Sequence, residues 1–248
     1  MSNSAAAFDV DDCPPSATAE GLACRAQRLS MQYGSEDAET IIRAGLAAFP
    51  GRIALVSSFG AESVALLHLA ARVDPTIPVI FLDTGKHFAQ TLSYRKKLAA
   101  RLGLTNVRDV TPNTDELTVQ DPKGDLWRRD TDACCALRKS APLSDVLQGF
   151  DAWITGRKQF HGGDRMHLPA FENSGPHIKV NPLIRWNAKQ IAAYIAVHEL
   201  PAHPLVAQGY PSIGCWPCTK PAASGENVRA GRWRGAEKTE CGIHTSAS

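Results

Sequence analysis

The sequence has no uninterrupted apolar run of the about 18 residues that a membrane-spanning helix needs. It also lacks a strong excess of charge, since a formal net charge of +2 gives no global sign of binding to nucleic acid or to a membrane surface. The first residues lack the basic and apolar stretches of a secretory signal, so we predict a cytoplasmic protein with reduced cysteines. With 248 residues, 44% of them hydrophobic, the chain is long enough for one large globular domain or two small ones.

Cysteine is the residue type that stands out, with seven in the chain. In a reducing compartment cysteines are better explained as metal ligands or nucleophiles than as a disulfide framework. Cys134 and Cys135 are adjacent, and a Cys-x-x-Cys motif follows at Cys215 and Cys218. These thiolates suit a zinc ion or an iron–sulfur cluster, and the adjacent pair, which can reach two different irons, favours the cluster. Two buried thiols and an unrelated Cys-x-x-Cys are the plainer alternative.

Short apolar runs alternate with helical patterns along the chain, as expected for strands that are buried on both faces. The predicted strands cover residues 52–58, 79–82, 106–110, 152–156 and, at an edge, 178–183. The predicted helices begin near residue 20 and at Asp132, and cover residues 36–49, 64–72, 88–102 and 187–200. This order predicts an α/β fold with a doubly wound, mostly parallel sheet. We divide the chain into a flexible N-terminal segment with a short helix (1–34), an α/β domain (35–225) and a mobile tail (226–248).

Small polar residues follow the first two predicted strands, where ligands bind in such sheets. The loop residues expected to bind a ligand are Ser57, Ser58, Phe59, Gly60 and Ser63. Their hydroxyls and free N–H groups stand at a helix start and could cradle an anion, although a plain turn with a capping serine would look the same. Asp83 and Thr84 end the second strand. Asp83 could bind a ribose or a base, or simply cap a turn.

Basic residues lie close in sequence to these motifs. Lys139 follows Cys135 by four residues, which predicts the same helical face one turn on, although a solvated lysine is as common. The loop after the fourth predicted strand contains Arg157, Lys158 and Arg165. A positive loop that contains glycine suits closure over an anion, and it is also a common kind of protein surface.

The C-terminal tail carries Arg229 and Arg232 and then Cys241 beside a glycine. We predict that the Cys241 thiol is exposed and reactive, because nearby cations stabilise a thiolate. A redox-inert tail cysteine is the alternative. Cys13 and Cys24 lie in the N-terminal segment, and we assign them no role.

Taken together, these motifs resemble the bacterial assimilatory sulfonucleotide reductases, and in particular the iron–sulfur branch that acts on adenylyl sulfate (adenosine 5′-phosphosulfate, APS). The segments that carry the resemblance are 57–63, 82–85, 134–139, 209–218, 229–233 and 240–244. They occur in family order, and the cysteine pattern with a terminal Glu-Cys-Gly-x-His is the most specific part. The chain departs from the family at Gln90, where an acidic residue is expected, and residues 159–165 match its basic loop only loosely.

The resemblance implies an adenine nucleotide α-hydrolase-like fold, related to the ATP-pyrophosphatases. In those relatives the first loop reads approximately SGGxDS, and Phe59 and Glu62 break that pattern here. The change suits a nucleotide that carries sulfate instead of a triphosphate. The resemblance also implies a [4Fe–4S] cluster, whose ligands would be Cys134, Cys135, Cys215 and Cys218.

The resemblance implies that Cys241 attacks the sulfur of APS, expels AMP and becomes an S-sulfocysteine. A separate thioredoxin would then release sulfite, as part of sulfate assimilation and cysteine biosynthesis. The cations expected to offset the repulsion between thiolate and substrate are Lys139, Arg229 and Arg232, with Arg157 and Arg165 as further contributors.

Three other functions fit parts of the sequence. A reductase for the 3′-phosphorylated nucleotide (PAPS) is the nearest, although that branch generally lacks the four cluster cysteines, and dual use of both nucleotides is open. An ATP-dependent tRNA-thiolating enzyme shares the fold, but needs an intact pyrophosphate loop and a tRNA-binding surface. A metal-binding regulator would explain the four cysteines but not Cys241. The sequence leaves open whether the chain forms a homo-oligomer.

Overall fold

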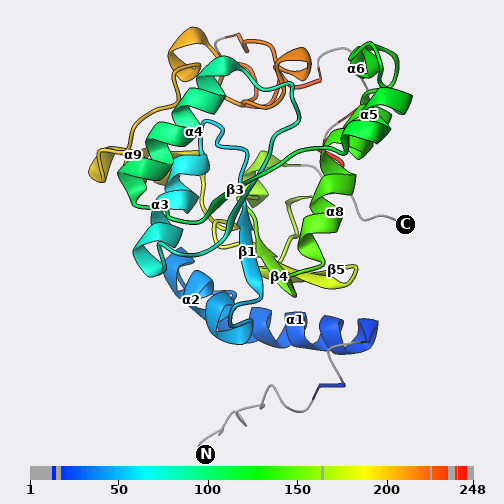
Figure 1. Cartoon of the computed structure of the whole chain (residues 1–248). Helices are drawn as coiled ribbons and strands as arrows, with labels where there is room; N and C mark the ends of the chain where they lie inside the picture. Colours follow the sequence, from blue (N-terminus) through cyan, green and yellow to red (C-terminus); the bar gives the residue numbers. More distant parts are fainter. Residues whose placement is uncertain are drawn as a thin grey trace, which may run out of the picture.

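A six-stranded sheet forms the centre of the computed structural model, which describes residues 13–14, 18–162, 165–223, 225–233, 238 and 240–244 (Figure 1). In spatial order the strands are β3 (Val107–Val110), β2 (Val79–Leu82), β1 (Ile53–Val56), β4 (Ala152–Ile154), β6 (His177–Val180) and β5 (Phe171–Ser174). Strand β5 runs antiparallel to β6, and the other neighbouring pairs are parallel. The predicted mostly parallel α/β sheet is confirmed. The expected flexibility of the N-terminal segment concerns residues 1–12 and 15–17, which lie outside the described residues.

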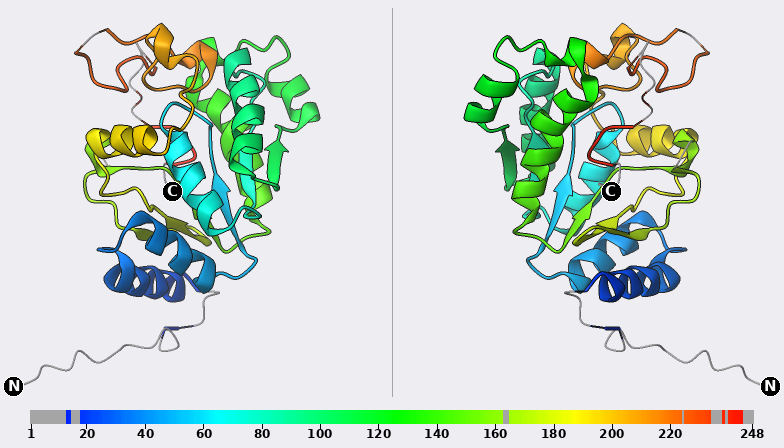
Figure 2. Two further views of the ribbon diagram at one scale, coloured as in Figure 1. Left: turned by 90° about the vertical axis from the view of Figure 1, so that its left-hand side faces the viewer. Right: turned by 90° about the vertical axis from the view of Figure 1, so that its right-hand side faces the viewer.

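Both faces of the central strands are covered, which explains why these strands are continuously apolar. Successive side chains of a strand point to opposite faces, and on β1 Ile53 and Leu55 join one core cluster while Ala54 and Val56 join another. The first cluster packs under α2 (Ala38–Ala48), α3 (Ser63–Val73) and α4 (Ala89–Leu102), and the second packs under α8 (Ala141–Leu147). The two helical layers are visible in Figure 2. The sheet is therefore doubly wound, as predicted.

The helix ends follow from local chemistry. Asn187 caps α9 (Ala188–Val197) through a reciprocal capping box with Gln190, as the sequence predicts. Asp37 accepts a hydrogen bond from the Thr40 N–H at the start of α2. Among the described residues, no helix is both long and apolar enough to cross a membrane.

The segment between β3 and the adjacent cysteines is helical, although no helix is predicted there from the sequence. It contains α5 (Thr114–Gln120), α6 (Leu126–Arg129) and α7 (Thr131–Cys135). The residue that caps α7 is Asp130, which accepts from the Ala133 N–H at 2.9 Å, so the prediction of a cap at Asp132 was wrong. Asp132 instead pairs with Lys238 of the tail. These helices are short and mostly exposed, so they lack the apolar periodicity that reveals a longer helix.

Lys139 lies in a π-helical turn, η2 (Ala136–Ser140), and not in a regular α-helix as predicted. Pro142 follows this turn and has no N–H to donate to the carbonyl group of Arg138, which an α-helix would require. The Ala141 N–H bonds to the Ala136 carbonyl group instead, five residues back. The helix is therefore widened at the segment that presents Lys139.

On the side of β4 the sheet ends at β5 and not at the segment 178–183, so the prediction of an edge strand there was wrong. Strand β6 lies between β4 and β5, and a turn at Gly175, with φ at 60°, joins β5 to β6. Strand β5 carries mostly polar side chains, which hid it in the sequence. Helix α1 (Ala19–Tyr33) lies beside it, and the Ser30 hydroxyl donates to the Phe171 carbonyl group at 2.7 Å and accepts from the Phe171 N–H at 3.0 Å.

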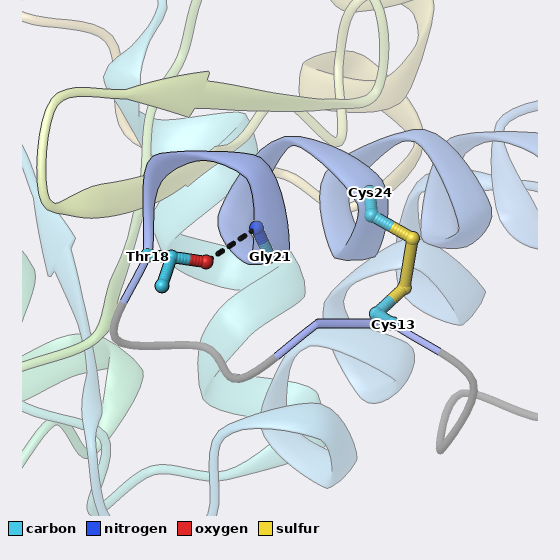
Figure 3. The surroundings of a disulfide bond; sticks show 4 residues. All are labelled: Cys13, Thr18, Gly21 and Cys24. Atoms are coloured by element: carbon cyan, nitrogen blue, oxygen red, sulfur yellow. Dashed lines mark hydrogen bonds between the residues drawn. A yellow bond between two sulfur atoms is a disulfide. The ribbon is translucent and has the colours of Figure 1, made fainter.

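Cys13 and Cys24 form a disulfide, which corrects the expectation that all the cysteines are reduced (Figure 3). Cys24 lies on α1, and Cys13 precedes the helix, whose first turn is capped by the Thr18 hydroxyl at 3.0 Å from the Gly21 nitrogen. The Cα atoms of the two cysteines are 5.8 Å apart, a normal span for a disulfide. The bond ties the N-terminal segment to α1.

Candidate active site

A cavity of about 210 Å³ opens at the carboxyl ends of β1 and β4. The chain builds β2 and β3 on one side of β1 and then crosses to β4 on the other side. The crevice between two such strands is where open α/β sheets bind their ligands. Ser57 continues β1 into the cavity wall, and Thr155 and Gly156 continue β4. Sheet topology therefore marks this cavity as the candidate site.

The loop after β1 is held open by its own hydrogen bonds. The Phe59 N–H donates to the Ser57 hydroxyl at 3.1 Å, and the Gly60 N–H donates to the Ser63 hydroxyl at 3.0 Å. Phe59 adopts a left-handed backbone with φ at 49°. A side chain on Gly60 would stand 3.2 Å from the Ile213 carbonyl oxygen, which explains the glycine. The loop thus reaches the cavity without a bulky side chain at position 60.

Three of the predicted ligand-binding residues lie outside the cavity lining. Phe59 is fully buried, with its ring edge-on to Phe81 at 5.8 Å between centroids. Asp83 accepts from the Gly85 N–H at 3.1 Å and so closes its own turn. The Thr84 hydroxyl lies 3.3 Å from the sulfur of Cys215. The other predicted residues line the cavity together, namely Ser57, Ser58, Gly60, Ser63, Lys139, Arg157, Arg165, Arg229, Arg232 and Cys241.

Buried cations make the cavity wall strongly positive. Burial and the neighbouring Arg165 lower the pKa of both Arg157 and Arg229 to about 10. Burial also lowers the pKa of Lys158, although Glu62, at 2.8 Å, acts in the opposite direction. Guanidinium groups with a pKa of about 10 stay charged at neutral pH. The wall can therefore bind a ligand with several negative charges.

Arg232 reaches this wall through a gap that only glycine leaves. A side chain on Gly214 would stand 2.4 Å from a nitrogen of the Arg232 guanidinium. The guanidinium also lies over the Trp233 ring, 4.5 Å from its centroid. Gly214 directly precedes Cys215, so the same turn presents a cysteine and makes room for a cation.

Cys241 lines the cavity and is half-buried, so its thiol is less exposed than predicted. Its sulfur is 3.7 Å from the Lys139 ammonium nitrogen. A hydrogen bond from Cys135 and the charge of Lys139 hold the pKa of Cys241 well below its usual value, although burial acts in the opposite direction. Burial lowers the pKa of Lys139, but negative charge nearby, chiefly that of Cys241, outweighs burial and raises the pKa overall. The two groups therefore stabilise each other as an ammonium–thiolate pair.

The four predicted cluster ligands lie on two segments that meet near Lys139, with two cysteines on each segment. Cys134 and Cys135 end α7, and Cys215 and Cys218 lie at the short turn η6 (Trp216–Cys218). All four are free thiols. Burial raises the pKa of Cys134, and the charges of Cys215 and Cys218 raise it further, so the two segments are close. In the part of the chain that the structure describes, no three His, Cys, Asp or Glu side chains converge as they would around one metal ion.

A buried ion pair supports these segments, and the sequence analysis missed it. Asp121 accepts from Arg138 at 2.6 Å and from the Leu126 N–H at 2.8 Å. Arg138 also donates to the Thr84 carbonyl group at 2.9 Å. Both partners are buried, and the pair connects the end of α5 to the π-helical turn beside Cys134 and Cys135. Nothing in the local sequence marks Asp121, because its partner lies in another element.

The sequence analysis also assigned no ligand-binding role to the acidic partners of the cavity cations. Glu62 lies 2.8 Å from Lys158 and 3.3 Å from His161. Glu240 accepts from Arg165 at 2.5 and 2.6 Å. Both carboxylates lie next to residues that the sequence analysis names as site candidates. Several cations in one buried cavity need acidic partners, and this need points to Glu62 and Glu240.

The comparison with known proteins joins this geometry to a family. Residues 52–221 match the family model described as the phosphoadenosine phosphosulfate reductase domain. The chain belongs to this family. Adenosine 5′-phosphosulfate reductase of Mesorhizobium japonicum is 50% identical over 92% of this chain and 90% of its own length. The protein of the same name from Rhodococcus erythropolis is 37% identical over 93% of this chain and 97% of its own length.

Solved structures show the same fold. Phosphoadenylyl-sulfate reductase from Candida auris, in a phosphate complex, has a TM-score of 0.66 at 26% identity and covers 79% of this chain and 96% of that one. FMN adenylyltransferase from Candida glabrata shares the fold, with a TM-score of 0.54 at 16% identity over 86% of this chain and 70% of that one. Family membership makes the chain an oxidoreductase that acts on a sulfur group. The matched region lies inside the α/β part, while the division of the chain after residues 34 and 225 stays a prediction.

Proposed function

We propose that this protein reduces adenosine 5′-phosphosulfate to sulfite and AMP, with thioredoxin as electron donor and Cys241 as nucleophile. The observation that carries the proposal is the position of the Cys241 sulfur, 3.7 Å from Lys139 inside a cationic cavity at the switch point of the sheet. The names of the most similar relatives that we compared agree with this substrate.

The first step transfers a sulfonate group to Cys241. The thiolate attacks the sulfur atom of the nucleotide, an S–S bond forms, and the bond between that sulfur and the bridging oxygen breaks. AMP leaves with the electron pair of the broken bond, and Cys241 becomes an S-sulfocysteine. The Lys139 ammonium group, 3.7 Å from the Cys241 sulfur, stabilises the thiolate without a separate base.

The cavity cations make this step possible by offsetting the repulsion between an anionic nucleophile and an anionic substrate. Lys139 stands beside the nucleophile, and Arg157, Arg165, Arg229 and Arg232 line the rest of the wall. Buried, preorganised charges are worth more than the same charges in water. Ser57 and Ser63 keep hydroxyl hydrogens free to donate to the ligand, because each hydroxyl accepts a hydrogen bond from the loop.

The second step needs a dithiol protein of the thioredoxin type. One of its thiolates attacks the Cys241 sulfur, sulfite leaves, and a mixed disulfide forms. The second thiol of the thioredoxin-type protein then attacks the sulfur of that protein's first cysteine in the mixed disulfide. Cys241 leaves as a thiol, and the dithiol becomes a disulfide. The dithiol thus supplies the two electrons that reduce the transferred sulfur from the oxidation state of sulfate to that of sulfite. Cys241 would have to leave the cavity for this step.

We further propose that Cys134, Cys135, Cys215 and Cys218 hold a [4Fe–4S] cluster. The donors suit a cluster in type and number, because all four are free thiols on two neighbouring segments, although the described side chains do not converge around one centre. A cluster bound there would join α7 to the η6 turn and add an electrostatic field beside Lys139. Thr84 and Arg138 support the site from the side of the sheet.

The test is anaerobic purification, analysis for iron and zinc, and an assay of sulfite and AMP with reduced thioredoxin. We expect a brown protein with about four irons per chain. We also expect sulfite from APS and little from PAPS. A colourless protein with one zinc would contradict the cluster. Absence of sulfite with both nucleotides would contradict the reaction, and faster release from PAPS would assign the other substrate.

A further inference from the structure

The anion site of the cavity is already filled by a side chain of the protein. Glu240 accepts from the Nε of Arg165 at 2.5 Å and from an Nη at 2.6 Å, so carboxylate and guanidinium meet as a two-pronged pair. A second guanidinium, that of Arg229, lies 3.7 Å from the same carboxylate. Arg165 and Arg229 are among the residues assigned above to the anionic substrate. Glu240 therefore stands where a substrate oxyanion would bind.

The pair leaves little of Arg165 for a second anion. The remaining terminal nitrogen of Arg165 is 3.1 Å from the ring nitrogen of His161, and the side chain is only 7% exposed. The carboxylate is the favoured form of Glu240: burial alone would raise its pKa, but the hydrogen bond and charge of Arg165 lower it. Sulfate and phosphate bind the guanidinium fork with the same two-oxygen geometry as a carboxylate. An oxyanion can reach Arg165 only when Glu240 gives way.

The position of Glu240 next to Cys241 makes this competition specific to the reaction. The two residues are adjacent, so the carboxylate on Arg165 and the sulfur beside Lys139 belong to one docked segment. The same segment continues to His244, whose ring is stacked on Trp153 with the centroids 6.0 Å apart. Several contacts thus hold the segment, and the Glu240 contact is the one that a small anion can replace in kind.

We propose that Glu240 is a specificity-determining residue, which excludes simple anions from the cavity by occupying Arg165. A ligand that binds only through an oxyanion must displace this carboxylate without any further contacts that would add to its binding free energy. A nucleotide that also contacts the rest of the cavity has further binding free energy to offset the displacement. The inference rests on the proposed function only in identifying that nucleotide, and the exclusion of small anions stands on the geometry alone.

Inorganic sulfate is a suitable probe because its binding needs no turnover. Its affinity should be measured by isothermal titration calorimetry with the anaerobically purified full chain. Removing a charge-assisted hydrogen-bonded pair shifts an equilibrium by about tenfold or more. We therefore expect Glu240→Gln to bind sulfate at least about tenfold more tightly than the unaltered chain. Glu240→Ala should show the same gain, so the result does not depend on one variant folding well.

Two further variants distinguish displacement from a general change of charge. Glu62→Gln removes one negative charge from the same cavity but leaves Glu240 on Arg165, so its gain should be clearly smaller. In Arg165→Ala/Glu240→Gln the gain should disappear, because the freed guanidinium is absent. A gain in Glu62→Gln equal to that in Glu240→Gln would overturn the proposal, as would unchanged affinity in both Glu240 variants. Failure of the APS assay would leave this titration interpretable, so the two proposals can fail separately.

Discussion

The protein holds two groups of cysteines in different chemical states. Cys13 and Cys24 form a disulfide beside α1 (Figure 3), whereas Cys134, Cys135, Cys215, Cys218 and Cys241 are free thiols. The free thiols lie among buried cations and within reach of one another's charges.

The chemistry open to a cysteine is therefore decided by its surroundings and not by the residue type. A cation such as Lys139 stabilises a thiolate, and a thiolate is the form that attacks sulfur or binds metal. A cysteine with a partner within disulfide range and no such cation is suited to cross-linking. The comparison therefore predicts catalytic effects at one group and stability effects at the other.

The largest effect is expected for Cys241→Ser. A hydroxyl group does not form the S-sulfocysteine, so sulfite release should fall by about 10⁴-fold or more, as for other lost nucleophiles. Iron content and nucleotide affinity should stay as they are, because Cys241 is not one of the four proposed ligands. The assay measures sulfite with APS and reduced thioredoxin. Loss of iron in this variant would mean that the ligand set is assigned wrongly.

The next effect is expected for Asp121→Asn, which tests the support beneath the free thiols. The amide can still accept from the Leu126 N–H, but Arg138 loses its buried counter-charge. Removing one partner of a buried ion pair costs about 3–5 kcal/mol of unfolding free energy. The measurement is urea unfolding under anaerobic conditions. A loss below about 1 kcal/mol, typical of an exposed pair, would contradict the burial of this contact.

The same pair predicts a pH dependence. Arg138 and the Leu126 N–H lower the pKa of Asp121 in the folded state, although burial acts in the opposite direction. A depressed folded pKa gives stability that is complete above the unfolded value of about 3.9 and is lost as the pH falls through the folded value. The gap between the unaltered chain and Asp121→Asn should thus be full at neutral pH and shrink below about pH 4. A constant gap from neutral to acidic pH would argue against this cause.

A smaller catalytic effect is expected for Lys139→Ala. Removing one preorganised charge beside the reacting atoms typically lowers turnover by about 10²–10³-fold. Alkylation of Cys241 should also slow at neutral pH, because less of the thiol is ionised without the ammonium group. Arg128→Ala, on the exposed helix α6, is the matched control and should leave both rates unchanged. Equal turnover in Lys139→Ala and the control would make Lys139 a bystander.

The smallest effect is expected for Cys24→Ser. The disulfide closes a loop of 11 residues, and the loss of such a bond costs at most about 3 kcal/mol in the chain-entropy account. Sulfite release should be unchanged. Thermal unfolding with and without a reducing agent checks the result, and reduction should bring the unaltered chain down to the variant. A fall in turnover would show that the disulfide also supports the active site.

The sequence predicts the sheet because its central strands are apolar on both faces, which leaves few other structures for residues 52–58 and 79–82. Strand β5 is not predicted, because it lies at an edge of the sheet and its side chains are mostly polar. Its register is fixed by its partner strand β6. The helices α5 and α6 are not predicted either, because they are too short and too exposed to show a helical period of apolar residues. The π-helical turn before α8 depends on Pro142 and on packing around it, which no pattern in residues 136–140 reveals.

The candidate site is predictable where one residue type carries the chemistry, as for the cysteines and the arginines. The site is less predictable where the role of a residue depends on the direction in which its side chain points. Phe59 belongs to the expected ligand loop, but its ring turns into the core against Phe81. Glu240 stands next to the predicted nucleophile, yet its pairing with Arg165 joins residues that lie 75 positions apart. Such pairs follow from the folded chain and not from local sequence.

The two hydrogen bonds between Ser30 and Phe171 have a consequence for association between molecules. A strand at the edge of a sheet presents unpaired N–H and carbonyl groups, to which a strand of another molecule can add. In β5 the Ser30 hydroxyl engages both outward groups of Phe171, and α1 lies across that edge. The contacts that hold α1 beside β5, including the disulfide to Cys13, therefore also block the addition of a further strand at Phe171.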